Sequence, residues 1–447
     1  MHPDTATLAR LARWLALPML VVVAAALAIS LHRTGHTQGD DFALYLRQAR
    51  SIFDGDIGAV VADNRFSVLN SDGAFSPIAY PWVWPLLLSP FVHLWGYDYD
   101  RLKLVEVALF CLWLVLLHGI VRRRIGRPAA LAIVAVFATA PAYLAHTDQL
   151  LTEFPHLAAI AIVIWWYDRI RTNATLLSAG TRELFILGAL VTVAFNVRRE
   201  SVVLLGVIAV MQCYDLVRMP GEIDTNARRS WHAIVTPYLA FASTAVLAQL
   251  LLPTALLPDN GNKSSFLDDR LSEYPAILSE QLGLGDHTAV GIAILLLAAA
   301  GALIGVKRRP TLDGPLLLLA LLSALAISTH LRKVERYWFQ ITPWVLYFAT
   351  VALITIVTSL AESARATRAG DQAVEPSSPS FRRWVSVVAM VPLLAIVAIH
   401  VAVLPGRVSE ASDYNDAGRV QSGPSNPVVA PIYDAVNDFT PPDAIIA

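Results

Sequence analysis

The chain has 447 residues, of which 56% are hydrophobic and 15% charged, and its formal net charge at pH 7 is -1. Its mean hydropathy of +0.55 is too high, and its charge content too low, for an ordinary water-soluble globular protein. The composition therefore predicts an integral membrane protein. Neither a Gly-rich phosphate loop nor a cluster of Cys and His is present in the sequence. We expect neither cytoplasmic nucleotide chemistry nor a nucleic-acid partner.

Hydrophobic stretches recur along the whole chain. A transmembrane helix needs about 20 predominantly apolar residues, and a shorter stretch can cross if it is tilted or broken. The sequence predicts an all-α polytopic membrane protein with about 11 transmembrane helices in a domain spanning residues 1–404. The predicted spans are 15–31, 103–121, 129–145, 154–167, 184–197, 201–217, 233–257, 288–306, 314–329, 338–360 and 384–404.

Basic residues are concentrated in alternate loops between the predicted spans. Lys and Arg are retained on the cytoplasmic side of short loops, so this asymmetry predicts a cytoplasmic N-terminus and an outer C-terminus. Residues 405–447 then form a short or truncated extracytoplasmic segment. The basic clusters that support this orientation are Arg10 with Arg13, Arg122–Arg124, Arg169–Arg182, Arg218–Arg229, Lys307–Arg309 and Arg365–Arg383.

One further apolar stretch, Ile78–Gly96, is not expected to cross the bilayer. Pro81, Pro85 and Pro90 would each remove a helical hydrogen bond where lipid offers no replacement. We expect one or more short helices in the outer membrane interface instead. They would lie in a long first extracytoplasmic loop, residues 32–102.

Adjacent carboxylates follow the first predicted span. Asp40 and Asp41 occupy the first outer loop, and Glu106 lies just inside the second predicted span. A carboxylate there can accept a proton from an attacking hydroxyl or hold a divalent cation. The alternative is that the pair caps a helix starting near Phe42, because Asp is a good N-cap.

A second acidic group falls in the short outer turn between the third and fourth predicted spans. His146, Asp148 and Glu153 lie there, with His156 close by. A short turn keeps these side chains near the bilayer, where they could position an acceptor or a metal ion. The alternative is simple solvation of a loop.

Cationic side chains are predicted on the same face, against the positive-inside tendency. An anionic ligand would explain them, since Arg binds phosphate oxygens in a bidentate manner. The alternative is pairing with Glu200, with Glu335 or with lipid headgroups. The candidate phosphate-binding residues are Arg198, Arg199, Arg332, Lys333, Arg336 and Tyr337.

Acidic residues near an acceptor and basic residues near a phosphate meet the needs of glycosyl transfer from a lipid phosphate. Arg can stabilise the phosphate that leaves, while a carboxylate deprotonates the incoming hydroxyl. The reaction would be a direct displacement at the anomeric carbon, and therefore inverting.

Several motifs resemble those of the GT-C glycosyltransferases, in particular bacterial relatives of protein O-mannosyltransferases and aminoarabinose transferases. They are Asp40-Asp41-x-x-x-Tyr45-x-x-x-Ala49, the stretch from Pro81 to Pro90, Arg198-Arg199-Glu200, and Arg336-Tyr337 followed by Pro343. The resemblance implies that the acidic residue of the first loop is the base or a metal-site residue. Asp41 is the preferred candidate and Asp40 the second. The usual outer C-terminal domain is missing or short, and Asp148 and Glu153 match the second-loop pattern only loosely.

The predicted activity is sugar transfer from a polyprenyl-phosphate donor to an acceptor hydroxyl on a protein, lipid or polysaccharide. No cofactor is assigned, and a divalent cation at Asp40 and Asp41 is the alternative to a metal-free base. The resemblance and the Ala-rich, Arg-over-Lys composition point to the bacterial cytoplasmic membrane, with the active site on its outer face and membrane lipids as neighbours. A transporter or lipid flippase, and a non-catalytic scaffold of the same fold, are the competing interpretations.

Overall fold

The structure is a computed structural model that describes residues 5–36, 41–70, 77–218, 227–254, 270–328, 334–369 and 387–421. Throughout these ranges the regular elements are helices, as expected for an all-α protein. In chain order they are α1 (Thr5–Ser30), α2 (Phe42–Asp54), α3 (Ile57–Leu69), α4 (Val83–Trp95), α5 (Tyr99–Ile125), α6 (Arg127–Thr139), α7 (Pro141–His146), α8 (Glu153–Asn173), α9 (Thr181–Phe195), the 3-10 helix η1 (Arg199–Val202), α10 (Val203–Arg218), α12 (Ala227–Leu251), α13 (Arg270–Gln281), α14 (Thr288–Arg308), α15 (Pro310–Ser328), the 3-10 helix η2 (Glu335–Gln340), α16 (Thr342–Ala369) and α18 (Val391–Asp416).

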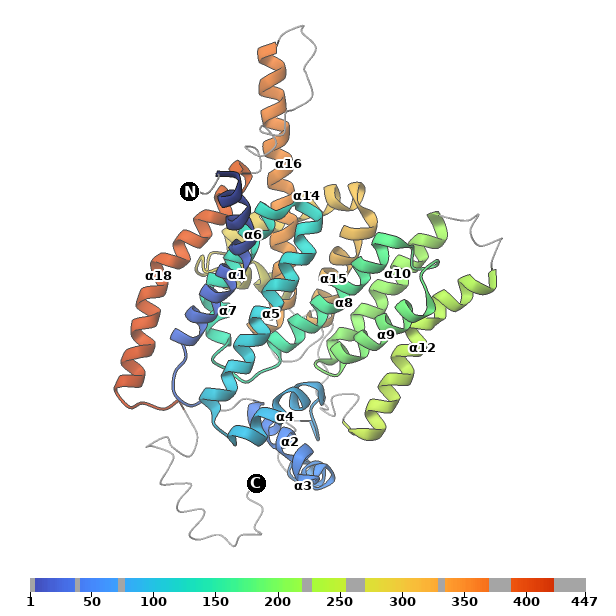
Figure 1. Cartoon of the computed structure of the whole chain (residues 1–447), viewed down its shortest axis with the longest axis vertical. Helices are drawn as coiled ribbons and strands as arrows, with labels where there is room; N and C mark the ends of the chain where they lie inside the picture. Colours follow the sequence, from blue (N-terminus) through green and yellow to red (C-terminus); the bar gives the residue numbers. More distant parts are fainter. Residues whose placement is uncertain are drawn as a thin grey trace.

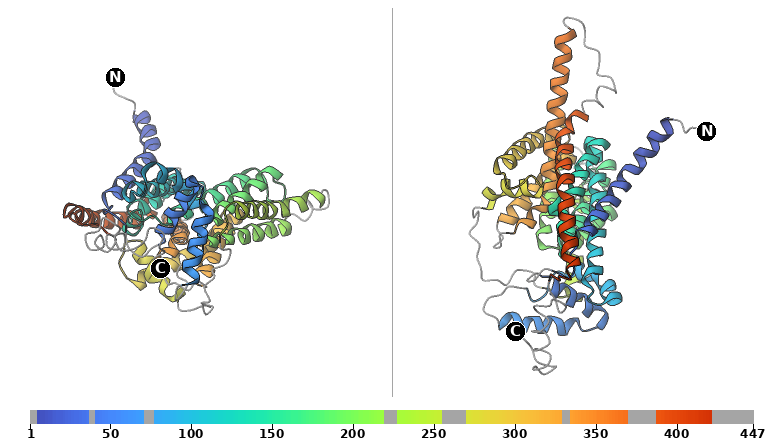
Figure 2. Two further views of the ribbon diagram at one scale, coloured as in Figure 1. Left: turned by 90° about the horizontal axis from the view of Figure 1, so that it is seen from below. Right: turned by 90° about the vertical axis from the view of Figure 1, so that its left-hand side faces the viewer.

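The long helices form a bundle, and α2, α3 and α4 cover one of its ends, which we call the loop end (Figure 1). Helix α1 begins at the opposite end, and α18 runs down to the loop end. The C-terminal part of α16 projects beyond the rest of the bundle, as a second view also shows (Figure 2). The chain thus crosses the bundle repeatedly and places the first loop as a separate layer.

Each predicted span overlaps at least one helix, with 129–145 divided between α6 and α7, and the all-α polytopic fold is thereby confirmed. Among the described residues, seven helices are long and apolar enough to cross a membrane: those at 99–125, 199–218, 231–251, 288–308, 310–328, 342–365 and 391–416. Shorter apolar helices cover Trp14–Ser30, Val83–Trp95 and Arg127–Thr139. The count of about 11 spans therefore stays a prediction. Helix α18 continues past the predicted span to Asp416, and residues 422–447 lie outside the described residues.

The proline-containing stretch folds as a short helix. Helix α4 has 13 residues, fewer than the roughly 20 needed to cross a bilayer. Pro85 lies in its first turn, where helical N–H groups have no intrahelical partner, and Pro90 lies further along. Helix α4 packs against α2 through a small apolar core that includes Tyr45, Leu46 and Trp84. The first loop is thereby a folded layer fixed to the bundle.

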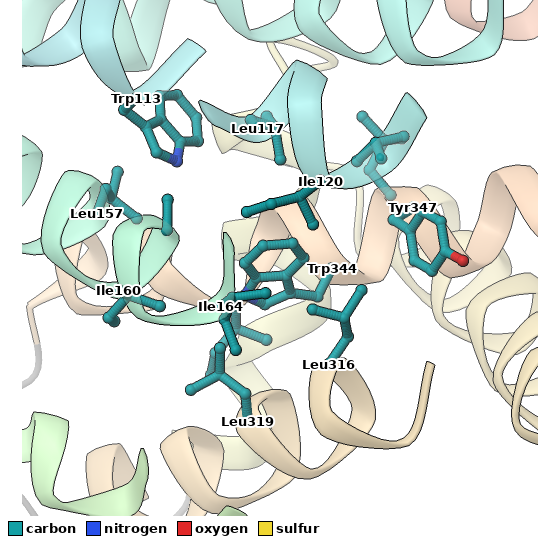
Figure 3. Packing of buried hydrophobic residues seen from close by; sticks show 14 of the residues in the cluster. Trp113, Leu117, Ile120, Leu157, Ile160, Ile164, Leu316, Leu319, Trp344 and Tyr347 are labelled. Carbon is teal, nitrogen blue, oxygen red and sulfur yellow. The ribbon is translucent and has the colours of Figure 1, made fainter. Parts of the chain in front are cut away.

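The main core lies among α5, α8, α15 and α16. Trp113, Leu157, Leu316 and Trp344 come from these four helices and point into one buried cluster (Figure 3). Such an interior requires helices that are apolar on their packed faces as well as on the faces that meet lipid. This explains why the span helices show little amphipathic patterning in sequence.

Helices α14 and α16 approach each other at a glycine. A side chain at Gly301 would collide with the carbonyl group of Phe348 on α16. Small residues allow this close backbone contact, which is a common basis of helix association in membranes.

Buried ion pairs join the helix ends opposite the loop end. Arg124 donates to both carboxylate oxygens of Asp168, at 2.5 and 2.8 Å, and to the carbonyl of Leu312 at 2.8 Å. Asp313 accepts a hydrogen bond from Tyr347 at 2.7 Å and lies 3.5 Å from Nε of Arg124. One member of the basic cluster at 122–124 is therefore a structural residue linking α5, α8 and α15. The membrane sidedness of this end remains a prediction.

Candidate active site

Asp41 precedes α2 at the loop end. It is the N-cap residue of that helix, but its side chain makes no capping hydrogen bond. Its Oδ1 atom instead accepts a hydrogen bond of 2.5 Å from the hydroxyl of Tyr80. The carboxylate is thus engaged across the first loop and not by its own helix. Asp40 lies outside the described residues.

Tyr80 is held in place from α2. The fully buried Gln48 donates to the carbonyl of Tyr80 and accepts from its backbone N–H, both at 3.0 Å. The ring of Tyr45 packs against that of Tyr80, with centroids 4.6 Å apart. Burial, reinforced by the negative charge of Asp41, raises the pKa of Tyr45 well above its ordinary value. Tyr45 therefore remains a neutral phenol at physiological pH.

A network of charged side chains surrounds Arg198, which follows α9. Its Nη1 atom lies 3.0 Å from Oε1 of Glu153, its Nη2 atom lies 3.1 Å from Oε1 of Glu200, and its guanidinium stands 4.6 Å from the ring centroid of Tyr337. Nε of Arg336 lies 3.1 Å from the same oxygen of Glu153. Burial opposes the charge of Arg198, but the carboxylates of Glu200 and Glu153 outweigh it and raise its pKa.

Tyr45 connects these two groups. It lies within electrostatic range of Asp41 and Tyr80 on the one hand and of Arg198 and Glu153 on the other. The structure therefore brings the first-loop aspartate and the Arg198 network to the same end of the bundle, around one buried tyrosine.

Glu106 lies beneath this region on α5. Its side chain is 1% exposed, and its Oε1 atom makes no hydrogen bond within the described structure. It interacts with the backbone of Leu151 and is electrostatically coupled to Glu153, whose Oε2 atom is likewise buried without a hydrogen bond. The sequence predicted Glu106 as a neighbour of Asp40 and Asp41, whereas its described interactions are with Glu153 and Leu151.

Arg199 differs from its neighbour Arg198. Its Nη1 atom donates to Oδ1 of Asn196 at 3.2 Å, and the guanidinium stacks on Phe195 at 4.3 Å. Its Nε and Nη2 atoms are buried without a hydrogen-bond partner in the described part of the chain. The carbonyl of Asn196 accepts from the N–H of Val83, three residues after Tyr80. Arg199 thus has two donors without a described partner, and the residues just before it contact the start of α4, three residues after Tyr80.

Asp148 belongs to a different network. It lies 2.8 Å from Nζ of the buried Lys103 and accepts from the backbone N–H of Arg33 at 3.1 Å and from Gln421 at 2.7 Å. Burial raises the pKa of Asp148, while Lys103 works in the opposite direction. These contacts join the ends of α1, α5 and α18. Asp148 and Glu153, which the sequence placed in one group, therefore enter two separate networks.

The remaining predicted site residues either bond within their own helix or lie outside the described residues. His146 bonds to the carbonyl of Ala142 on its own helix, at 2.9 Å. Arg332 and Lys333 are outside the described residues. The described side chains contain no group of three or more His, Cys, Asp or Glu that could hold a metal ion. A divalent cation at Asp40 and Asp41 stays a prediction, and no step of the mechanism below is routed through it.

Tyr80 and Gln48 were not singled out from the sequence. Gln48 lies three residues after Tyr45, so the two side chains share one face of α2. This spacing is visible in the sequence and could have indicated that Gln48 lies near Tyr45. Tyr80 falls in the non-helical segment before α4, and its contact with Asp41 spans 39 positions. No local pattern reveals such a contact.

The fold of this chain is similar to that of several solved structures. ArnT from Cupriavidus metallidurans, bound to undecaprenyl phosphate, matches with a TM-score of 0.53 and 17% identity over 90% of this chain and 75% of that one. The oligosaccharyltransferase of Archaeoglobus fulgidus, tethered to an acceptor peptide, matches with a TM-score of 0.52 and 12% identity over 96% of this chain and 58% of that one.

The arabinosyltransferase EmbB from Mycobacterium smegmatis matches with a TM-score of 0.50 and 12% identity over 89% of this chain and 40% of that one. The chain therefore spans less than two thirds of the oligosaccharyltransferase and of EmbB. No protein-family model and no curated protein sequence matches it. At these identities the similarity establishes the fold alone, which this chain shares with ArnT, the oligosaccharyltransferase and EmbB.

Proposed function

We propose that this protein is a membrane glycosyltransferase. It would transfer a sugar from a polyprenyl-phosphate donor to an acceptor hydroxyl at the extracytoplasmic face of a bacterial cytoplasmic membrane. The observation that carries the proposal is the hydrogen bond from Tyr80 to Asp41 at the loop end, where the N–H of Val83 donates to the carbonyl of Asn196, two residues before Arg198. The fold shared with ArnT, which was captured with undecaprenyl phosphate, supports the class of donor.

In the proposed reaction Asp41 is the general base. Tyr80 occupies its Oδ1 atom, which leaves Oδ2 to accept the proton of the acceptor hydroxyl. The acceptor oxygen then bonds to the anomeric carbon as the bond from that carbon to the phosphate oxygen breaks. The electron pair of that bond leaves with the lipid phosphate, so the configuration at the anomeric carbon inverts.

Among the described candidate cations, Arg199 is best suited to the leaving phosphate. Arg198 is already shared by two carboxylates, and Arg336 is paired with Glu153. Arg199 has two buried donors without partners, and leaving such donors unpaired is costly unless a ligand meets them. Arg198 and Arg336 would then shape the site, while Arg199 would bind the phosphate.

The donor class can be tested with purified protein in detergent. A panel of radiolabelled sugars, some linked to polyprenyl phosphate and others to a nucleotide, would be incubated with membrane extract as the source of acceptor. Transfer or hydrolysis from the polyprenyl-linked sugars alone supports the proposal. Turnover of nucleotide-linked sugars would refute the proposed donor, and no turnover with any donor would favour a transporter or a scaffold.

A further inference from the structure

The segment that leads into α4 is held by side chains at successive carbonyl groups. We call residues 77–80 the strap. Asn64 donates to the carbonyls of Pro77 and Ile78 at 2.7 and 2.8 Å, and Thr254 donates to that of Ala79 at 2.8 Å. Gln48 completes the series by bonding to both backbone groups of Tyr80. The strap is therefore fixed by α2, α3 and the segment after α12.

This fixing is unusual for a segment without regular secondary structure. Irregular backbone segments usually lie at the surface, where water satisfies their polar groups. Here the side chain of a fully buried glutamine, Gln48, bonds to the backbone of one residue, Tyr80. Such a buried amide is stabilising only if its donors and acceptors are all used in a defined geometry. What this geometry fixes is the position of the Tyr80 hydroxyl.

That hydroxyl has a defined target. Its hydrogen bond to Oδ1 of Asp41 is 2.5 Å long, within the range of O–H···O⁻ bonds to a charged acceptor. The Tyr45 ring on the same face of α2 supports the Tyr80 ring from one side. The chain thus holds the hydroxyl against the carboxylate through contacts from three elements.

We propose that Tyr80, fixed by Gln48 and the strap, is the positioning residue for Asp41, turning the second oxygen of the carboxylate toward the acceptor. This inference rests on the proposed role of Asp41 as base. Tyr80 itself transfers no group and makes no covalent bond. Its hydrogen bond to Oδ1 fixes the orientation of the carboxylate, and a general base must be oriented to reach the proton it accepts.

The test compares Tyr80→Phe with wild type in the sugar-transfer assay. Phe retains the ring that packs on Tyr45 and removes the hydroxyl alone. We expect kcat to fall about 10- to 100-fold, which corresponds to the loss of one hydrogen bond to a charged group. KM for the donor should change little, because Tyr80 acts on Asp41 and not on the donor. Tyr97→Phe, the same change at an exposed tyrosine of the first loop, should leave both kcat and KM unchanged.

A second variant keeps the test informative if Tyr80→Phe folds poorly. Gln48→Leu leaves the tyrosine hydroxyl in place and removes the bonds that hold the strap. It should reduce kcat in part, and its effect should not add to that of Tyr80→Phe, because both act through one contact. Full additivity, or an unchanged kcat in Tyr80→Phe, would overturn the inference.

A readout independent of turnover separates this inference from the proposed function. In protein with carbon-13 at the Asp carboxyl groups, the resonance lost in Asp41→Asn identifies Asp41. The position of this resonance should change in Tyr80→Phe, because the carboxylate loses a hydrogen bond, and stay in place in Tyr97→Phe. If the resonance moves in Tyr80→Phe while Asp41→Asn retains full activity, the proposed base is refuted and the Tyr80 contact stands. An unchanged resonance in Tyr80→Phe refutes the positioning role itself.

Discussion

Arg198 and Glu153 are 45 positions apart in sequence, yet Nη1 of the arginine lies 3.0 Å from Oε1 of the glutamate. The same oxygen lies 3.1 Å from Nε of Arg336. A single carboxylate at the start of α8 therefore holds two guanidinium groups, one following α9 and one in η2. Because all three groups are largely removed from water, each depends on its partners for its charge to be tolerated.

Glu153→Gln should consequently destabilise the protein by about 3–5 kcal/mol, since it leaves two largely buried guanidinium groups without their shared anion. Denaturant or thermal unfolding in detergent measures the change. The matched control is Asp63→Asn, which breaks the pair with Arg47 in which both side chains are nearly half exposed. Exposed pairs contribute about 0–1 kcal/mol. Equal effects of the two substitutions would contradict the structural role assigned to Glu153.

His32 should make stability depend on pH. Burial, with the positive charge of Lys103, lowers the pKa of His32 from 6.5 to about 4. The unfolded chain binds this proton below pH 6.5, whereas the folded chain does so only near pH 4. The free energy of unfolding therefore has its full value above pH 6.5. It decreases as the pH falls toward 4, by at most about 3 kcal/mol, because the unfolded chain takes up the proton first.

Unfolding of wild type and His32→Asn across this range measures the effect. As the pH falls, wild type should lose stability relative to His32→Asn, because Asn cannot take up the proton. Parallel curves for the two proteins would show that His32 titrates normally in the folded state.

Gly301→Ala should separate α14 from α16, since the added methyl group would meet the carbonyl of Phe348. We expect a loss of about 1–3 kcal/mol, typical of overpacking, in a thermal unfolding experiment. Gly119→Ala is the control, because a methyl group at Gly119 on α5 meets no atom within 4 Å. A Gly301→Ala protein as stable as the Gly119→Ala protein would show that the two helices can move apart without cost.

Arg199→Gln should weaken binding of polyprenyl phosphate by about 10- to 100-fold, the expected loss for hydrogen bonds from a charged donor. Binding can be measured by native mass spectrometry or by displacement of a labelled lipid, without any turnover. Arg47→Gln provides a control at an exposed arginine of the first loop. Retention of wild-type affinity by Arg199→Gln would exclude it as the main phosphate ligand.

Much of the fold is readable from the sequence because membrane spans obey simple constraints. Length and apolarity locate the helices, and the prolines of the stretch at 78–96 predict a short helix, which α4 is. That α4 does not cross the bilayer stays a prediction. The limits of α18 were less predictable. Its helix continues to Asp416 through polar sequence that carries no apolar signal.

The site was predictable in residue type but not in pairing. Cationic residues against the positive-inside tendency drew attention to Arg198 and Arg199, and the acidic outer turn drew attention to Glu153; all three lie at the loop end. Their partners depend on tertiary contacts between distant helices, which local pattern does not encode. The separation of Asp148 from Glu153, and the role of Gln48, follow from packing of the first loop on the bundle.

The measurement that tests the central claim most directly is the rate of sugar release from a labelled polyprenyl-phosphate donor by wild type and by Asp41→Asn. Asp63→Asn serves as a matched change at an exposed aspartate, and unfolding of all three proteins verifies that they are folded. The account predicts turnover by wild type and Asp63→Asn and its loss in Asp41→Asn. Equal turnover by all three folded proteins would contradict the assignment of Asp41 as the base.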